Sequence, residues 1–237
     1  MSRCGVQRSP RDVRHRVRTS GHNSRVELSD RPRLRGLFHG YAFFAAVAAG
    51  AALVALAEGA RARVACAIYA ASLAGMFGAS ALYHLVPWRS PRARDWARRL
   101  DHAMIFVLIA GTYTPFALLA LSGLLPVILL VVIWCGAVLG VVLNTRWIDA
   151  PKWVTTSLYL LVGWAGVVAA PQIFTELSVA SAVLVTVGGV LYTLGALAYA
   201  TQWPNPFPAH FGFHEVFHLL VVAAAVTQFV AVSSVAI

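Results

Sequence analysis

The sequence predicts an all-α, polytopic membrane protein with seven transmembrane helices. Three observations support this class: a very apolar composition, seven long apolar stretches, and an uneven distribution of basic residues. Of the 237 residues, 59% are hydrophobic and only 12% are charged, whereas an ordinary globular domain carries about 25% charged residues. So few charges cannot cover the surface of a soluble domain of this size. The composition also excludes a disordered chain, and three cysteines exclude a disulfide-rich scaffold.

Each apolar stretch is long enough to cross about 30 Å of hydrocarbon as a helix. The predicted spans are 37–57, 64–86, 102–121, 124–143, 153–171, 179–200 and 214–236. Short connections between them indicate that sequential helices are antiparallel neighbours. The runs are continuous rather than alternating, which argues against a β-barrel. Residues 37–237 are therefore predicted to form one seven-helix transmembrane domain.

The basic residues predict how this domain is oriented. The net charge is +10, and ten arginines lie within residues 1–36, which contain no apolar run. We interpret residues 1–36 as a disordered basic arm that sets topology, with binding of lipid headgroups or nucleic acid as the alternative. If the arm is cytoplasmic, 17 bases lie inside and only Arg61 and Arg63 lie outside. The positive-inside rule then places the N-terminus in the cytoplasm and the C-terminus outside the plasma membrane. Because topology accounts for these charges, no nucleic-acid partner is expected.

A few ionisable residues lie within or at the ends of the predicted spans. They are His39, His84, Asp101, His102, His214, Glu215 and His218. Ionisable groups at membrane depth are costly, so each is a candidate functional residue. Because the span direction alternates, all of them are predicted to lie in the cytoplasmic half of the membrane. The sequence therefore predicts one polar site at that end of the bundle.

Helical spacing indicates which of these residues can act together. His214 and His218 are four residues apart, so both imidazoles project from one helix face, about 6 Å apart, and can chelate one ion. Ser80 and His84 have the same spacing. A third imidazole from His84 would leave a fourth position open, which is typical of a catalytic zinc site. Asp101 is a candidate to act as a base or to orient a ligand histidine.

Purely structural alternatives exist for several of these residues. Ser80 can be a helix-packing residue among small neighbours. Asp101 can simply pair with Arg98 or Arg99. His39 can be an interfacial or packing histidine. These alternatives cannot be separated by spacing alone.

A second interpretation concerns the segment HEVFH at 214–218, which matches the zinc metalloprotease signature H-E-x-x-H. In that case Glu215 would be the general base, whereas the alternative places Glu215 at the aqueous boundary. The 19 residues after His218 contain no Asp, Glu, His or Cys, so the third ligand must come from upstream. This fits His84 and weakens the protease interpretation. His102 can face solvent or headgroups in either case.

Three segments together carry a resemblance to a known family. They are SALYH at 80–84, RLDHAMIFVLIAGTYTPF at 99–116 and FHEVFHLLVV at 213–222. The combination resembles the bacterial hemolysin III family, over roughly residues 31 to 237. That family is grouped with the progestin and adipoQ receptors, including the adiponectin receptors, and with alkaline ceramidases in a superfamily of membrane hydrolases.

The resemblance implies a seven-helix bundle with a cytoplasmic N-terminus and one Zn²⁺ ion. It implies that His84, His214 and His218 hold the zinc, and that Ser80 and Asp101 are catalytic residues near the zinc-activated water. The expected activity is zinc-dependent hydrolysis of a membrane lipid amide or ester. A receptor or sensor with a structural zinc is the second hypothesis. The family name adds cytolysis or channel formation as a third, although no span has the continuous polar face of a pore.

Overall fold

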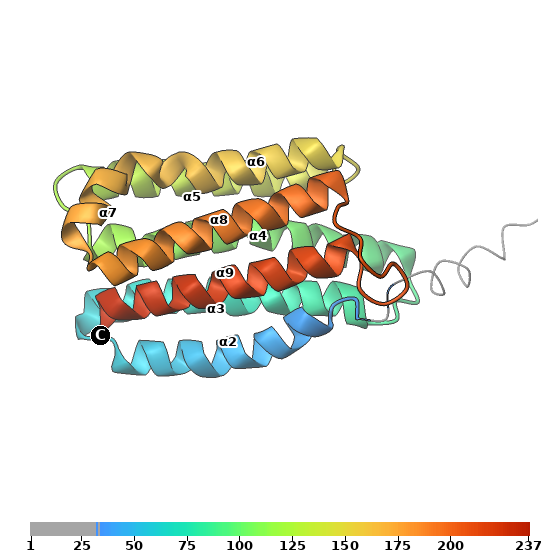
Figure 1. Cartoon of the computed structure of the whole chain (residues 1–237), viewed down its shortest axis with the longest axis horizontal. Helices are drawn as coiled ribbons and strands as arrows, with labels where there is room; N and C mark the ends of the chain where they lie inside the picture. The colour runs from blue at the N-terminus through green and yellow to red at the C-terminus, as the bar shows by residue number, and fades with distance from the viewer. Residues whose placement is uncertain (1–31, 33) are drawn as a thin grey trace, which may run out of the picture. The chain divides into compact units, whose positions relative to one another are not determined.

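A computed structural model describes residues 32 and 34–237, and in this part of the chain seven helices are long and apolar enough to cross a membrane (Figure 1). No strand forms there, apart from one isolated bridge between Phe207 and Phe211. The elements are α2 (Leu37–Leu56), α3 (Gly59–Leu85), α4 (Pro91–Leu119), α5 (Leu125–Arg146), α6 (Lys152–Trp164), η1 (Ala165–Ala169), α7 (Ala170–Glu176), α8 (Val179–Thr201) and α9 (Phe213–Ala236). The predicted seven-helix class is confirmed. The predicted basic arm falls mostly on 1–31 and 33, which lie outside the described residues.

Helix α4 begins well before the predicted start at residue 102. Ser90 is its N-cap and accepts a hydrogen bond from the backbone N–H of Ala93, and Pro91 occupies the first turn. Both residues favour a helix start at this point. Asp101 therefore lies about three turns inside α4, and only 9% of its surface is exposed. The arginines between Pro91 and Asp101 belong to a helix and not to a loop.

The fifth span is not one continuous α-helix. Residues Lys152–Glu176 form a single candidate span, but the 3-10 segment η1 separates α6 from α7. Pro171 lies in the first turn of α7. A proline lacks the backbone N–H of a regular turn, and its ring clashes with the preceding turn. The predicted uninterrupted helix over 153–171 is thus broken just before this proline.

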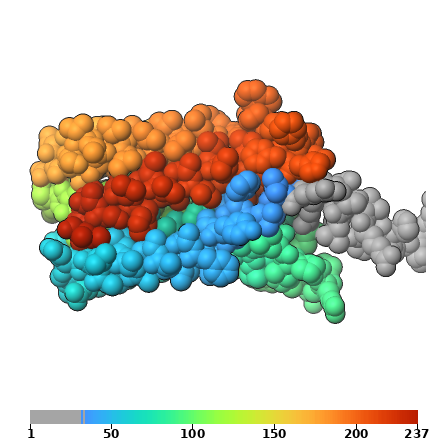
Figure 2. Space-filling view, turned by 60° about the horizontal axis from the view of Figure 1, so that its bottom comes forward, coloured from blue at the N-terminus to red at the C-terminus, as the bar shows by residue number. Residues whose placement is uncertain are grey.

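Helix α9 occupies a central place in the bundle. Sequential pairs pack together from α2 to α5, and α8 packs on α9 and α6. In addition α9 contacts α2, α3 and α4, and Figure 2 shows α9 running between α2 and α8 on one face. A side chain on the inner face of α9 can therefore meet residues from most other helices.

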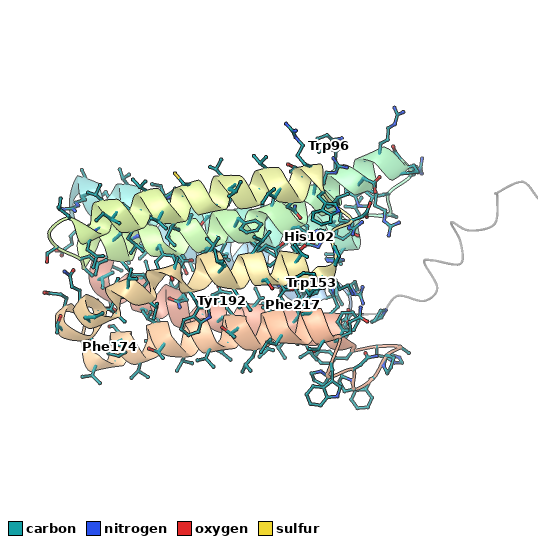
Figure 3. All side chains as sticks on the ribbon, turned by 90° about the horizontal axis from the view of Figure 1, so that it is seen from above. Trp96, His102, Trp153, Phe174, Tyr192 and Phe217 are labelled. Carbon is teal, nitrogen blue, oxygen red and sulfur yellow. The ribbon has the colours of Figure 1, made fainter. Side chains whose placement is uncertain are left out.

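We call the end at which α2, α4 and α9 begin, and α3 ends, the histidine end. In Figure 3, Trp96, His102 and Trp153 lie toward this end, and Phe174 lies at the opposite end. Chain direction alone brings the first turns of α2 and α9 next to the last turn of α3. The assignment of the histidine end to the cytoplasm stays a prediction.

Candidate metal centre

Three histidines from two helices converge at the histidine end. Ligand atoms of His84, His214 and His218 all lie within 4.8 Å of one another. The Nε2 atoms of His84 and His214 are 3.2 Å apart, and the rings of His214 and His218 have centroids 4.4 Å apart. His84 comes from the last turn of α3, and the other two come from the first turns of α9. The structure thus brings together the three residues that the sequence singled out as metal ligands.

The donor set fits a divalent zinc ion. Nitrogen ligands at 2.0–2.1 Å from a tetrahedral zinc are separated by about 3.3 Å, close to the 3.2 Å between the Nε2 atoms of His84 and His214. Only 2% of the surface of His218 is exposed, and its Nδ1 atom has no hydrogen-bond partner. A buried imidazole nitrogen without a partner is unusual in a folded protein. A metal ion bound in this cluster would be coordinated by nitrogen atoms of all three imidazoles.

Asp101 and Ser80 lie beside the histidines. The Oδ2 atom of Asp101 is 3.6 Å from Nε2 of His84. Ser80 is one turn before His84 on α3, and only 1% of its surface is exposed. A carboxylate and a hydroxyl therefore lie next to the cluster. Among the described residues, only the three histidines belong to the group whose ligand atoms lie within 4.8 Å of one another.

His39 also belongs to this site. Its Nδ1 atom is 2.8 Å from the Ser80 hydroxyl, and its ring stacks on His218 with a centroid distance of 3.8 Å and an interplanar angle of 12°. Only 2% of His39 is exposed. The sequence placed His39 at the same depth as the other polar residues, but spacing within one helix could not show that it contacts residues of α3 and α9.

Glu215 is not part of the histidine cluster. It is fully buried. Its Oε1 atom accepts a 2.6 Å hydrogen bond from Arg35 Nε, and its Oε2 atom accepts one of 2.8 Å from the backbone N–H of Gly212. It therefore caps the N-terminus of α9, which also favours a negative charge there. Neither sequence-based interpretation of Glu215, as a protease base or as a residue at the aqueous boundary, describes this arrangement.

Two residues that the sequence assigned to the arm support the site. Arg35 forms the ion pair with Glu215. Gly36 has a φ angle of 83°, which disfavours side chains, and a Cβ atom built there would lie 2.6 Å from the Cβ atom of His84. No motif marks either residue, because both act through contacts with helices that are distant in the sequence.

His102 lies next to the site, in the wall of an adjoining cavity. Its Nδ1 atom donates to the backbone oxygen of Arg98 at 2.9 Å. Its side chain lines a cavity between the helices, so it does not simply face headgroups.

That cavity, of about 340 Å³, extends away from the histidine cluster into the bundle. Its walls include Asp101 and His218 at the histidine end and Phe174 and Gln228 farther along, and most of its surface is apolar. Small-molecule sites commonly have volumes of about 300–1,000 Å³. The arrangement therefore joins a polar head region to an apolar chamber within the membrane-spanning helices.

We expect replacement of Arg35 by methionine to destabilise the protein strongly. Removing one partner of a buried ion pair costs about 3–5 kcal/mol, because the remaining charge stays buried. The loss should be near the lower end, since 22% of the Arg35 side chain is exposed. Thermal unfolding of the purified protein in detergent measures the change. Arg98→Met is the control, because its partner Asp149 is 81% exposed and such pairs contribute about 0–1 kcal/mol. Equal effects of the two substitutions would contradict the prediction.

Taken together, the fold and the site define a multi-pass membrane protein with seven candidate spans, a three-histidine cluster and an apolar cavity. The family model described as Haemolysin-III related matches residues 29–229. The chain belongs to the haemolysin-III related family.

Individual relatives agree with this assignment. The hemolysin-3 homolog of Bacillus subtilis is 33% identical over 162 residues, which cover 68% of this chain and 72% of that protein. The hemolysin-3 of Bacillus cereus is 32% identical over 167 residues, covering 70% and 72%. The adiponectin receptor protein of Drosophila melanogaster is 29% identical over 176 residues, covering 67% of this chain and 39% of that protein. This match supports the wider grouping with the progestin and adipoQ receptors.

Proposed function

We propose that this protein is a zinc-dependent intramembrane hydrolase that cleaves an amide or ester bond of a membrane lipid. The observation that carries the proposal is the position of the three-histidine cluster, with Asp101 and Ser80 beside it, at the head of an apolar cavity. A membrane lipid fits both regions, because its carbonyl group can lie at the polar cluster while its acyl chain lies in the apolar cavity. Under the predicted topology the substrate enters from the cytoplasmic leaflet.

His84, His214 and His218 would hold the ion. Zinc, when bound, supplies a Lewis acid that polarises a carbonyl and promotes deprotonation of water. Asp101 accepts the proton of the attacking water and passes it to the nitrogen or oxygen of the leaving group. Ser80, held by His39 at 2.8 Å, hydrogen-bonds to the reacting oxygen. Water is consumed, and a carboxylic acid and an amine or alcohol are released.

The contacts of Glu215 and the number of ligands favour this proposal over its alternatives. A metalloprotease of the H-E-x-x-H type needs Glu215 as a base, but its two carboxylate oxygens bind Arg35 and Gly212. A structural zinc is usually closed by four protein ligands, whereas the cluster in the described part of the chain has three. An open coordination position is what hydrolysis requires.

The test combines metal analysis with an activity screen on the purified protein in lipid nanodiscs. We expect about one zinc per chain, and hydrolysis of at least one member of a panel of N-acyl amides and lysolipid esters. Zinc without any turnover across the panel would favour the sensor. If the protein hydrolyses no lipid of the panel but releases dye from liposomes at the same protein-to-lipid ratio, a cytolysin would be favoured. Absence of bound metal at saturating zinc would remove the proposal.

His39 should affect turnover through its hydrogen bond to Ser80. His39→Phe keeps a ring that can stack on His218 but loses the bond, whereas His39→Asn keeps a polar atom near the Nδ1 position. We expect kcat to fall about 3–10-fold in His39→Phe, the value of one hydrogen bond, with zinc content unchanged. His39→Asn should recover most of that loss. If both variants lose kcat equally, the hydrogen bond is not the reason.

A further inference from the structure

The cavity contains a second polar position that the proposed chemistry does not use. The hydroxyl of Tyr192 on α8 and the Oε1 atom of Gln228 on α9 are both buried and have no hydrogen-bond partner. Both residues line the same cavity as Asp101 and His218. Buried polar atoms without partners are costly, so two of them on residues that line one cavity need an explanation.

The orientation of the Gln228 amide is set by α8. Its Nε2 atom donates to the backbone oxygen of Val185 at 3.0 Å. Gly188 permits this close approach, because a Cβ atom there would lie 2.5 Å from that nitrogen. The amide nitrogen is therefore held on the backbone of α8, and the Oε1 atom remains as an acceptor. Only 6% of Gln228 is exposed.

The second polar position lies well away from the histidine cluster. Gln228 is ten residues after His218 on the same helix, which corresponds to about 15 Å along the axis. Figure 3 shows Tyr192 partway along the bundle, between Phe174 at one end and Phe217 nearer the histidine end. An extended chain with its carbonyl at the histidines would pass this position some way from its head.

We propose that Tyr192 and Gln228 form a subsite for a hydroxyl group in the middle of the ligand's acyl chain. A hydroxyl matches the two atoms chemically, since it can donate a hydrogen bond, which Gln228 Oε1 can accept, and accept one, which the Tyr192 hydroxyl can donate. A ketone cannot donate, and an unsubstituted chain leaves both atoms unpaired. The inference rests on the proposed function for the position of the ligand's head, and it names the ligand as a mid-chain hydroxylated acyl lipid.

Binding is measured with the full chain in phosphatidylcholine nanodiscs, by displacement of a fluorescent stearate analogue. The competitors are stearate, stearate hydroxylated at mid-chain, and stearate hydroxylated next to the carboxylate. We expect the mid-chain compound to bind about tenfold more tightly than the other two, as two hydrogen bonds would give. Tyr192→Phe and Gln228→Leu should each reduce this preference, and the double variant should abolish it.

Tyr41→Phe is the matched control, because it removes the same hydroxyl from a side chain that is 76% exposed on α2, and it should keep the preference. Tyr192→Phe should fold at least as stably as the natural chain, since it removes only an unpaired buried polar atom. Gln228→Leu also loses the hydrogen bond from Nε2 to the backbone oxygen of Val185, so Tyr192→Phe is the variant that separates lost binding from lost stability. Equal affinity for the three competitors, or a preference that survives in the double variant, overturns the subsite. The assay involves no turnover, so selective binding by a protein that lacks zinc would refute the hydrolase and leave the subsite standing.

Discussion

Replacing His218 with alanine is expected to reduce bound zinc from about one ion per chain to a trace. The variant keeps the imidazoles of His84 and His214, but these cannot replace the nitrogen donor that His218 supplied. Loss of a partner that only orients a ligand already costs about 10–100-fold in metal affinity, so loss of a ligand should cost more. Metal analysis after equilibration at a fixed free zinc concentration measures the change. Hydrolysis should fall in parallel.

His210→Ala is the matched control for this experiment. His210 is an exposed histidine in the connection between α8 and α9, and it lies outside the cluster. Its loss should leave zinc content and activity unchanged. His84→Ala should reproduce the effect of His218→Ala, because each variant removes one of three ligand atoms that lie within 4.8 Å of one another. Zinc that persists at one ion per chain in both His84→Ala and His218→Ala would show that the ion binds elsewhere.

Asp101→Asn is expected to abolish most of the turnover while zinc remains bound. The substitution keeps the shape and the burial of the side chain but removes the group that accepts the proton. General acid–base groups typically contribute about 10²–10⁴-fold to the rate, so kcat should fall within this range. Because Asp101 lies outside the three-histidine group, the zinc content should stay near one per chain. Initial rates on the best substrate of the panel, measured alongside metal content, test both parts.

The control for Asp101 is Asp149→Asn. Asp149 carries the same carboxylate and pairs with Arg98 at 3.1 Å, but its side chain is 81% exposed and it lies outside the three-histidine group. The Asp149→Asn substitution should change neither kcat nor the zinc content. If Asp101→Asn releases the zinc as well, Asp101 is a ligand, and the fourth protein donor would favour a structural metal and a sensor over an enzyme.

The sequence predicted the number of spans and the end at which the polar residues gather, because both follow from one-dimensional patterns. Seven apolar runs of sufficient length define seven helices, and alternation of direction then places His84 near His214 without knowledge of packing. The spacing of His214 and His218 implies one helix face by geometry alone. The helix boundaries were less accurate, as shown by the start of α4 at Pro91, since arginines on an exposed helical extension look like a loop in a hydropathy pattern.

Only the tertiary structure decided which polar residues share contacts. Glu215 is one residue from His214, yet its partner is Arg35, 180 positions away, so the H-E-x-x-H spacing misassigned its role. His39 contacts Ser80 and His218 through the packing of α2 against α3 and α9. The unpaired oxygens of Tyr192 and Gln228 become informative only once a cavity is seen to lie beside them. Composition and spacing determine which helices form and which way they run, whereas contacts between helices depend on side-chain packing that no local pattern specifies.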